Sequence, residues 1–273
     1  MYIFFDIGGT KMRVAASRDG EKIEEPRVVP TPQNYREGVE ALCTITRELT
    51  GAAKIDAVYG GVAGPFDKDR SMALAAPNLP EWAQKPLKRD IEQALSTTVM
   101  LENDSALAAL GEANFGAGRG YEIVAYMGVG TGIGGARIVG GRIDKNAIGF
   151  EIGHQIISEG GKRLHEYISG RTIQETYQKL PSEITDKEIW EHGARILAIG
   201  VHNMLVHWSP NVVVLGGSLV NDEWGMRVGQ VREQVKNIVK IYPNIPEIKP
   251  ATLKDYAGLY GALALLRQKN EIH

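Results

Sequence analysis

Three short apolar segments, each ending in glycines next to a Thr or a Ser, constrain the fold of this chain more than any other feature. They are FFDIGGT at 4–10, YMGVGTGIGG at 126–135 and VVVLGGS at 212–218. An apolar, β-rich run that stops at glycine predicts a strand ending in a turn. Because glycine has no Cβ, the backbone N–H groups of such a turn can approach an anion closely. The recurrence predicts two related halves that each offer a turn to one shared ligand.

The spacing of apolar residues elsewhere predicts alternating strands and helices. Strands are expected at 2–7, 12–18, 23–29, 57–61, 98–101, 123–127, 136–139 and 211–215, with a hairpin turn at Asp19-Gly20. Helices are expected at 35–50, 87–95, 104–115, 222–241 and 257–269, and over most of 162–208 with breaks at Gly170, Pro181 and Gly193. The stretch 64–86 is expected to be mostly loop. The fold class is therefore α/β.

Composition excludes several kinds of protein. The only cysteine, Cys43, cannot form an internal disulfide, which is typical of a reduced, cytoplasmic protein. The 31 Lys and Arg residues nearly balance the 33 Asp and Glu residues. The basic residues do not cluster, so nucleic-acid binding is not expected. The chain has no run of 18 consecutive apolar residues, so a membrane span is not expected. The N-terminus lacks the pattern of a signal peptide.

The two glycine-rich turns that contain threonine favour phosphate binding. Residues 128–135 hold five glycines, more than a hairpin needs, and Thr131 occupies the place that Thr10 has in the first turn. No Gly-Lys-Ser/Thr closes a Walker A loop, and a strand rather than a helix follows, which excludes a dinucleotide fingerprint. Asp6 at the end of the first strand can hold a hydrated divalent metal. The alternative is that both are ordinary hairpin turns.

Three polar segments are candidates for substrate chemistry. Asp104 follows a strand and opens a helix, so it is either the helix N-cap or a general base held with Asn103. Glu151 and His154 can bind vicinal hydroxyls, or they form a surface ion pair. A zinc site there is disfavoured, because only His165 and carboxylates lie nearby. The segment 77–82 (PNLPEW) is either a sugar-contacting loop or a plain surface loop.

The motifs, taken in order, resemble the ROK family (repressors, open reading frames and kinases) of the actin and hexokinase ATPase superfamily. The likeness extends to LYGALALLRQ at 259–268 and rests on these segments: DIGGTK, GVAGPF, APNLPEW, LENDSALAALGE, GVGTGIGG, FEIGH, EYISGRTI and VVLGGSL. The resemblance implies two ribonuclease-H-like lobes with a cleft between them. Residues 1–105 with 255–273 would form a small lobe that includes the returning C-terminal helix, and 106–254 a large one.

The resemblance also implies an activity, an ATP- and Mg²⁺-dependent hexose kinase, and a homodimer. Asp104 would deprotonate a hydroxyl, usually the 6-hydroxyl, of glucose or a related hexose. The sugar site would be lined by Asn78, Asn103, Asp104, Glu151, His154 and His165. The phosphates would be surrounded by Gly8, Gly9, Thr10, Lys11, Gly130, Thr131 and Gly132. Gly216 and Gly217 would flank the adenosine, and Asp6 would face Mg²⁺ through water.

The chain departs from the family pattern in three places. ROK kinases commonly carry a CxCGxxGC zinc loop after the EIGH histidine, whereas here QIISEGGKRLH follows His154, so zinc is predicted absent. The family glutamate beyond that loop, which contacts the sugar, aligns with His165, and Glu166 is the neighbouring residue. Which of the two takes the role of that glutamate stays open. Phe150 stands where the family often has glycine.

Two other functions fit the resemblance. ROK repressors sense sugars and place a helix-turn-helix domain ahead of the sugar-binding core. Such a domain is not expected here, because Asp6 lies six residues from the start. The presence of Asp104 and of both phosphate turns favours catalysis over an inactive sugar-binding protein. The identity of the hexose, and the choice between ATP and polyphosphate as donor, stay open.

Overall fold

The computed structural model describes residues 1–221 and 223–270 of the chain, which form two compact units. Among the described residues, unit 1 contains 1–114, 145–149 and those from 256 onward, and unit 2 contains those within 115–144 and 150–255. The chain therefore returns to unit 1 twice after it first leaves that unit. Each unit is built on its own five-stranded sheet.

The sheet of unit 1 has the strand order β3-β2-β1-β4-β5. Its strands are β1 (Tyr2–Ile7), β2 (Lys11–Ser17), β3 (Arg27–Pro30), β4 (Ala57–Val62) and β5 (Thr98–Asn103). The first three strands form an antiparallel meander, whereas β4 and β5 run parallel to β1. The carboxyl ends of β1, β4 and β5 therefore lie at one edge of the sheet.

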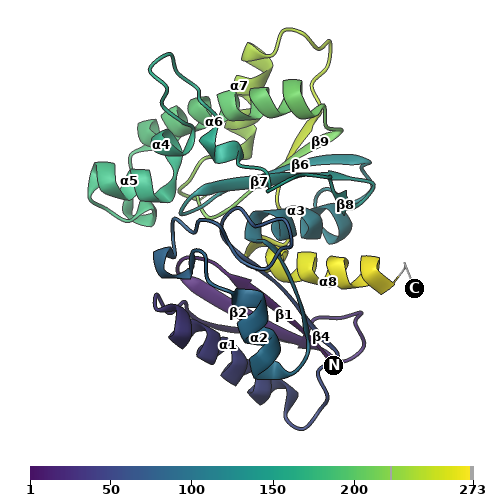
Figure 1. The fold of residues 1–273 in the computed structure, drawn as a ribbon. Coiled ribbons are helices and arrows are strands. Elements are labelled where there is room, and N and C mark those ends of the chain that lie inside the picture. The colour runs from purple at the N-terminus through teal and green to yellow at the C-terminus, as the bar shows by residue number, and fades with distance from the viewer. Residues whose placement is uncertain (222, 271–273) are drawn as a thin grey trace. The chain divides into compact units, whose positions relative to one another are not determined.

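Helices cover both faces of this sheet (Figure 1). Apolar side chains of β1 alternate, and Ile3, Phe5 and Ile7 pack into a core with α1 (Tyr35–Thr50) and α2 (Leu87–Leu95). The opposite face carries α8 (Ala257–Asn270), which follows the short helix η4 (Lys254–Tyr256). There α8 packs closely on α3 (Asp104–Phe115), since a Cβ on Gly261 would lie 1.9 Å from the Leu107 carbonyl oxygen. Another short helix, η1 (Pro80–Trp82), precedes α2.

Unit 2 repeats the topology of unit 1. Its sheet has the order β10-β9-β6-β7-β8, with strands β6 (Ile123–Val129), β7 (Ile133–Val139), β8 (Arg142–Ile143), β9 (Val212–Gly216) and β10 (Glu247–Pro250). The first three are antiparallel neighbours, and β9 and β10 run parallel to β6. In chain order both sheets thus read 3-2-1-4-5. The recurrence of glycine turns in the sequence corresponds to this structural repeat.

The helices of unit 2 enclose a second core. The helices of this unit are α4 (His165–Ile168), α5 (Gly170–Tyr177), α6 (Lys187–Trp208) and α7 (Val228–Ile238). The short helix η2 (Ile152–His154) precedes α4, and η3 (Pro181–Glu183) lies between α5 and α6. In Figure 1, α6 and α7 lie along one face of the sheet. The apolar residues of that face, such as Met127 and Leu215, are buried with Leu197 and Val231 of these helices.

The predicted α/β class is confirmed, and most predicted elements lie within two or three residues of their observed bounds. Three local predictions were wrong. Gly193 does not break a helix, because α6 passes through it and its missing side chain makes room for Met226. Asp19-Gly20 is no two-residue hairpin, since the Asp19 carboxylate accepts hydrogen bonds from the amides of Glu21 and Lys22 within a longer loop. The helix expected at 222–241 spans only Val228–Ile238, and residue 222 lies outside the described residues.

No helix in the described ranges 1–221 and 223–270 combines the length and the hydrophobicity that a membrane span needs.

Candidate functional site

In unit 1 the candidate residues gather where β1, β4 and β5 end. The three strands are parallel, so the turn after β1 (Gly8-Gly9), the bend after β4 (Ala63-Gly64) and the start of α3 follow strand ends at the same edge. A Cβ on Gly61 would lie 3.1 Å from the Cα of Asp104, which shows how closely β4 passes the start of α3. Ligands of open α/β sheets bind at such carboxyl edges.

Asn103, not Asp104, caps helix α3. The Asn103 side-chain oxygen accepts a hydrogen bond from the backbone N–H of Ala106 at 2.9 Å, and its amide nitrogen donates to the Gly64 carbonyl at 3.0 Å. The interpretation of Asp104 as N-cap is therefore wrong, because the residue before it does that work. Asp104 is the first residue of the helix instead.

The Asp104 carboxylate is half-buried and bound through one oxygen. Its Oδ1 accepts hydrogen bonds from the backbone N–H of Ser105 at 2.7 Å and from the Ser105 hydroxyl at 3.3 Å. No group among residues 1–221 and 223–270 donates to Oδ2. Desolvation raises the pKa of Asp104, and the bonds from Ser105 oppose that rise. A carboxylate with one anchored and one available oxygen is suited to accept a proton.

The turn after β1 keeps two N–H groups available for a ligand. The N–H of Gly8 closes the turn by donating to the Lys11 carbonyl at 3.0 Å. Within the described part of the chain, the backbone N–H groups of Gly9 and Thr10 have no acceptor. Thr10 is exposed, and the Thr31 hydroxyl braces the turn by donating to the Gly8 carbonyl. The arrangement is typical of a turn that binds an anion.

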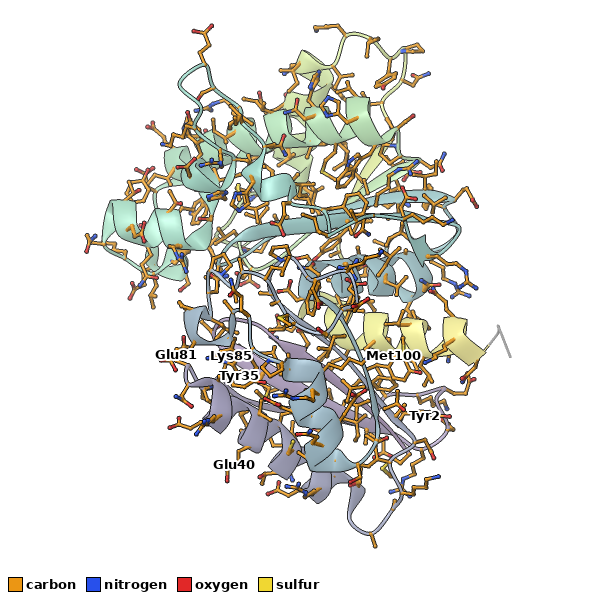
Figure 2. The ribbon with its side chains drawn as sticks, in the orientation of Figure 1. Tyr2, Tyr35, Glu40, Glu81, Lys85 and Met100 are labelled. Atoms are coloured by element: carbon orange, nitrogen blue, oxygen red, sulfur yellow. The ribbon has the colours of Figure 1, made fainter. Side chains whose placement is uncertain are left out.

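Asn78 lies against this turn, because a Cβ on Gly9 would come within 2.7 Å of the Cβ of Asn78. Buried side chains hold its loop: Leu79 is fully buried, and Trp82 packs edge-on against Tyr35 with ring centroids 5.5 Å apart. Trp82 is only 2% exposed and fills the space left by Gly38, so it anchors the loop. Figure 2 shows Tyr35 beside Glu81 and Lys85 of the same loop.

Asp6, on β1, forms an ion pair with Arg13, its direct neighbour on β2, at 3.4 Å between Oδ2 and Nη1. Helix α8 passes close by, since a Cβ on Gly258 would lie 2.9 Å from the Asp6 side chain. Carboxylate oxygens are suitable ligands for Mg²⁺, which usually retains several of its waters. A contact through water therefore fits Asp6 better than direct coordination, because Arg13 shares the carboxylate.

In unit 2 the turn between β6 and β7 is braced on two sides. The N–H of Gly130 closes the turn on the Gly132 carbonyl at 2.9 Å. The first amide of α5, Gly170 N–H, donates to the Gly130 carbonyl at 2.8 Å, and Arg171 N–H donates to the Thr131 carbonyl at 3.2 Å. The N–H groups of Thr131 and Gly132 have no acceptor among the described residues. Both units thus offer a pair of N–H groups in equivalent turns.

The turn after β9 packs directly against this one. Gly217 has a φ of +86°, and a Cβ there would lie 2.4 Å from the Val129 carbonyl oxygen. The N–H of Leu219 donates to that same carbonyl at 2.9 Å. Only glycine satisfies both the positive φ and the close approach. The turns at 130–132 and 216–217 therefore form one continuous edge of unit 2.

The short helix η2 carries His154 next to the start of strand β7. Gly153 packs on β7, since a Cβ on it would lie 2.3 Å from the Ile133 carbonyl oxygen. Phe150, the departure from the family pattern, packs edge-on against Trp208 with centroids 5.2 Å apart and so fastens the start of the segment to α6. Glu151 and His154 are both exposed. The His154 ring lies beside the His165 ring, with centroids 4.4 Å apart.

Glu102, on β5, belongs to a polar cluster that the sequence did not predict. The Glu102 side chain is mostly buried; it accepts a hydrogen bond from Asn103 N–H at 2.9 Å and lies 3.5 Å from the Arg70 guanidinium. Desolvation raises the pKa of Glu102. Arg70 also donates to the Asn146 side chain at 2.9 Å, within the segment 145–149 that belongs to unit 1. No sequence signal links residues 70, 102 and 146, which meet only in the fold.

The predicted site residues thus fall into one group in each unit. Unit 1 holds Asp6, Gly8, Gly9, Thr10, Lys11, Asn78, Asn103 and Asp104, and unit 2 holds Gly130, Thr131, Gly132, Glu151, His154, His165, Gly216 and Gly217. Across the described ranges, no three His, Cys, Asp or Glu side chains group closely enough to hold a metal ion.

Comparison with known proteins gives a consistent result over the whole chain. A family model described as the ROK family matches residues 2–269. A glucokinase of Streptomyces coelicolor is 27% identical over 98% of both chains. An N-acetyl-D-glucosamine kinase of Escherichia coli O6:H1 is 29% identical over 97% of this chain and 99% of that one. The solved structure of a ROK family glucokinase from Streptomyces griseus, in complex with glucose and AMPPNP, has a TM-score of 0.83 and 27% identity over 98% and 99% of the two chains.

Proposed function

Because the chain belongs to the ROK family, we propose that it is a sugar kinase that transfers the γ-phosphoryl group of ATP to a hydroxyl of a hexose. Relatives that align over nearly the whole chain include glucokinases and N-acetylglucosamine kinases, which supports a hexose or an N-acetylated amino sugar as acceptor. A similar glucokinase binds glucose with AMPPNP, which supports ATP as donor. The 6-hydroxyl of glucose or of a related hexose is the proposed acceptor.

The observation that carries this proposal is the Asp104 carboxylate. Asn103 takes over the capping of α3, so Asp104 is left with one oxygen available at the carboxyl edge of the sheet. As general base, Asp104 takes the proton from the sugar hydroxyl. The hydroxyl oxygen of the sugar bonds to the γ-phosphorus while the bond from that phosphorus to the ADP oxygen breaks. Little other covalent chemistry is needed, because phosphoryl transfer depends mainly on positioning and charge neutralisation.

The other site residues would bind the phosphates, the adenosine and the sugar. The available N–H groups of Gly9, Thr10, Thr131 and Gly132 would bind phosphate oxygens, helped by the exposed Lys11. Gly216 and Gly217 would flank the adenosine, and Asn78, Asn103, Glu151 and His154 would bind sugar hydroxyls. Mg²⁺, when bound with ATP, would offset the charge of the phosphate oxygens, and Asp6 would hold its waters. The lobes of 1–105 with 255–273 and of 106–254, the homodimer and the cytoplasmic location stay predictions.

A coupled ADP-release assay tests the function. The panel contains glucose, mannose, fructose, allose and N-acetylglucosamine, each with ATP and Mg²⁺. A parallel arm with polyphosphate as donor measures sugar phosphate instead, because that donor releases no ADP. We expect sugar-dependent ADP release with at least one hexose. If no sugar on the panel raises ADP release above the sugar-free rate, and polyphosphate also fails, the kinase proposal is wrong.

The pH dependence of the reaction tests the role of Asp104. Because burial raises the pKa of Asp104, the base is protonated, and kcat/KM falls, at a higher pH than for an ordinary aspartate. Below that pKa we expect about a tenfold loss per pH unit. Glu102→Gln is the matched control, since Glu102 is the neighbouring carboxyl whose pKa is also raised. If the acidic limb disappears in Glu102→Gln, Asp104 is not its source.

Chelation tests the prediction that the protein holds no structural zinc. A structural zinc site contributes folding free energy directly, so its removal would destabilise the protein. We expect dialysis against EDTA to leave the melting temperature within about 1 °C, and Mg²⁺ alone to restore full activity. A drop in melting temperature that Zn²⁺ reverses would contradict the prediction.

A further inference from the structure

We propose that His165 is a positioning residue that fixes the ring of His154 for sugar binding, and that the hairpin 155–164 is the device that holds His165 in place. Only the expected effect on sugar binding rests on the proposed function. The geometry that supports it lies entirely within unit 2.

Residues 155–164 form a tight hairpin between η2 and α4. Leu164 N–H donates to the Gln155 carbonyl at 3.0 Å, and Ile157 N–H donates to the Lys162 carbonyl at 3.1 Å. The tip closes where Gly161 N–H donates to the Ser158 carbonyl at 3.0 Å. Since both ends of the hairpin are paired, His154 and His165 at its base are held side by side.

The base of the hairpin is fastened to helix α6. Leu164 is fully buried, and a Cβ on Gly200 would lie 2.6 Å from it, so the glycine provides the space that the leucine fills. The Gln155 side chain accepts a hydrogen bond from the Asn203 amide at 2.7 Å and donates to the Ile152 carbonyl at 2.8 Å. One apolar contact and one polar link therefore set the position of the hairpin relative to η2.

His165 uses this position to contact the histidine loop directly. Its Nδ1–H donates to the Gly153 carbonyl at 2.9 Å, because a carbonyl oxygen can only accept. That carbonyl begins the peptide bond that leads to His154. The two imidazole rings are tilted by 54° with centroids 4.4 Å apart, so the His165 ring also restricts the rotation of the His154 ring. The Thr172 hydroxyl in turn donates to the His165 carbonyl at 2.8 Å and fixes the start of α4.

Glu166 does not compete for this role. Its Oε2 accepts a hydrogen bond from Arg163 N–H at 2.7 Å and lies 3.8 Å from the Arg163 guanidinium, so the carboxylate is bound to Arg163 ahead of its own short helix. Between His165 and Glu166, only His165 bonds to the segment that carries His154. His165 rather than Glu166 therefore acts on the candidate sugar site, through His154 and not as the sugar contact expected of the family glutamate.

The charges around His154 agree with a neutral ring. Desolvation lowers the pKa of His154, as do His165 and Arg163, while Glu166 opposes them. A neutral imidazole has one donor and one acceptor, which suits two hydroxyls of a sugar. An orienting partner is therefore needed, because a freely rotating ring would exchange the two positions.

A double-mutant cycle on the full chain tests the proposal. The variants are His165→Ala, His154→Ala and the double substitution, with His192→Ala as control because His192 is an exposed histidine on α6. The dissociation constant is measured by calorimetry for the best hexose of the panel. We expect His165→Ala to weaken sugar binding by roughly tenfold, as loss of an orienting partner typically does, with little change in kcat at saturating sugar. In the His154→Ala background the second substitution should cost nothing further.

His165→Asn provides the rescue. The asparagine amide can take the place of Nδ1–H and donate to the Gly153 carbonyl, so we expect sugar affinity within about threefold of the original protein. Additive losses in the cycle would show that His165 acts on the sugar directly and would overturn the proposal. Failure of His165→Asn to restore affinity, in a variant with an unchanged melting temperature, would overturn it as well.

A readout without sugar separates this proposal from the kinase assignment. Imidazole NMR signals of His154 report its pKa and its ring mobility in the protein alone. We expect His165→Ala to raise the pKa of His154 towards the ordinary histidine value and to average its ring environment, whereas His192→Ala should change neither. Unchanged His154 signals in His165→Ala would refute the positioning role even if the protein is a sugar kinase. Changed signals would support it even if every hexose fails as substrate.

Discussion

Asp104→Asn should reduce kcat by roughly 10²- to 10⁴-fold, the usual contribution of a general base, while the dissociation constant for the sugar changes little. Asparagine preserves the shape of the side chain and the acceptor for Ser105 N–H, but it cannot take up a proton. Turnover is measured by ADP release and sugar affinity by calorimetry, both on the full chain. Full turnover in Asp104→Asn would exclude Asp104 as the base.

Asp104→Asn should lose turnover but not stability. Burial raises the pKa of Asp104 in the folded protein, so the stability linked to this group is greatest at low pH and is lost as pH rises through the folded-state pKa. At neutral pH the charged carboxylate is therefore a cost, which asparagine removes. We expect the melting temperature of Asp104→Asn at pH 7 to equal or exceed that of the original protein. Matched loss of stability and turnover would instead indicate a damaged fold.

Gly261→Ala should destabilise unit 1 by about 1–3 kcal/mol or more, the usual cost of overpacking. The added Cβ would lie 1.9 Å from the Leu107 carbonyl oxygen and 2.5 Å from its carbon, so α8 would have to move away from α3. Alanine favours the helical conformation by about 1 kcal/mol relative to glycine, which works in the opposite direction but is outweighed by the backbone clash. The urea midpoint and the melting temperature measure the effect.

Gly229→Ala is the matched control for this substitution. Gly229 lies in α7, and a Cβ there meets no atom within 4 Å, so only the helix-propensity gain remains. We expect no loss of stability in this variant. If Gly261→Ala were as stable as Gly229→Ala, the contact between α3 and α8 would not be as close as the structure has it.

The elements that were predicted correctly carry strong local signals. Tyr35–Thr50 has helical spacing of apolar residues and a capping Asn34 before it, and its observed bounds equal the predicted ones. Strand β1 combines β-branched and aromatic residues with a glycine stop, and it too was predicted at its observed bounds. Where the local signal was ambiguous, as at Gly193, the outcome depended on Met226, which is distant in sequence and could not be anticipated.

In the candidate site, too, some features follow from the local sequence and others depend on distant residues. Glycine turns after apolar strands indicate anion binding because their chemistry is local, and the sequence was sufficient to place them. Whether a given N–H is available is not local: Gly8 and Gly130 use theirs to close their turns, whereas Gly9 and Thr131 do not. Asn103 became the helix cap because β5 continues through it, which moved Asp104 to the first helical position.

By itself, the sequence determined the α/β class, the resemblance that the ROK family match later bore out, and the residue types available for phosphoryl transfer. Only the tertiary structure decided which residues contact one another: Asn78 on Gly9, α8 on α3 through Gly261, and His165 rather than Glu166 beside His154. The physical reason is that local conformation follows from neighbouring residues along the chain. Contacts between distant segments depend instead on strand register and on which side chains fill which gaps, and these are settled only when the core packs.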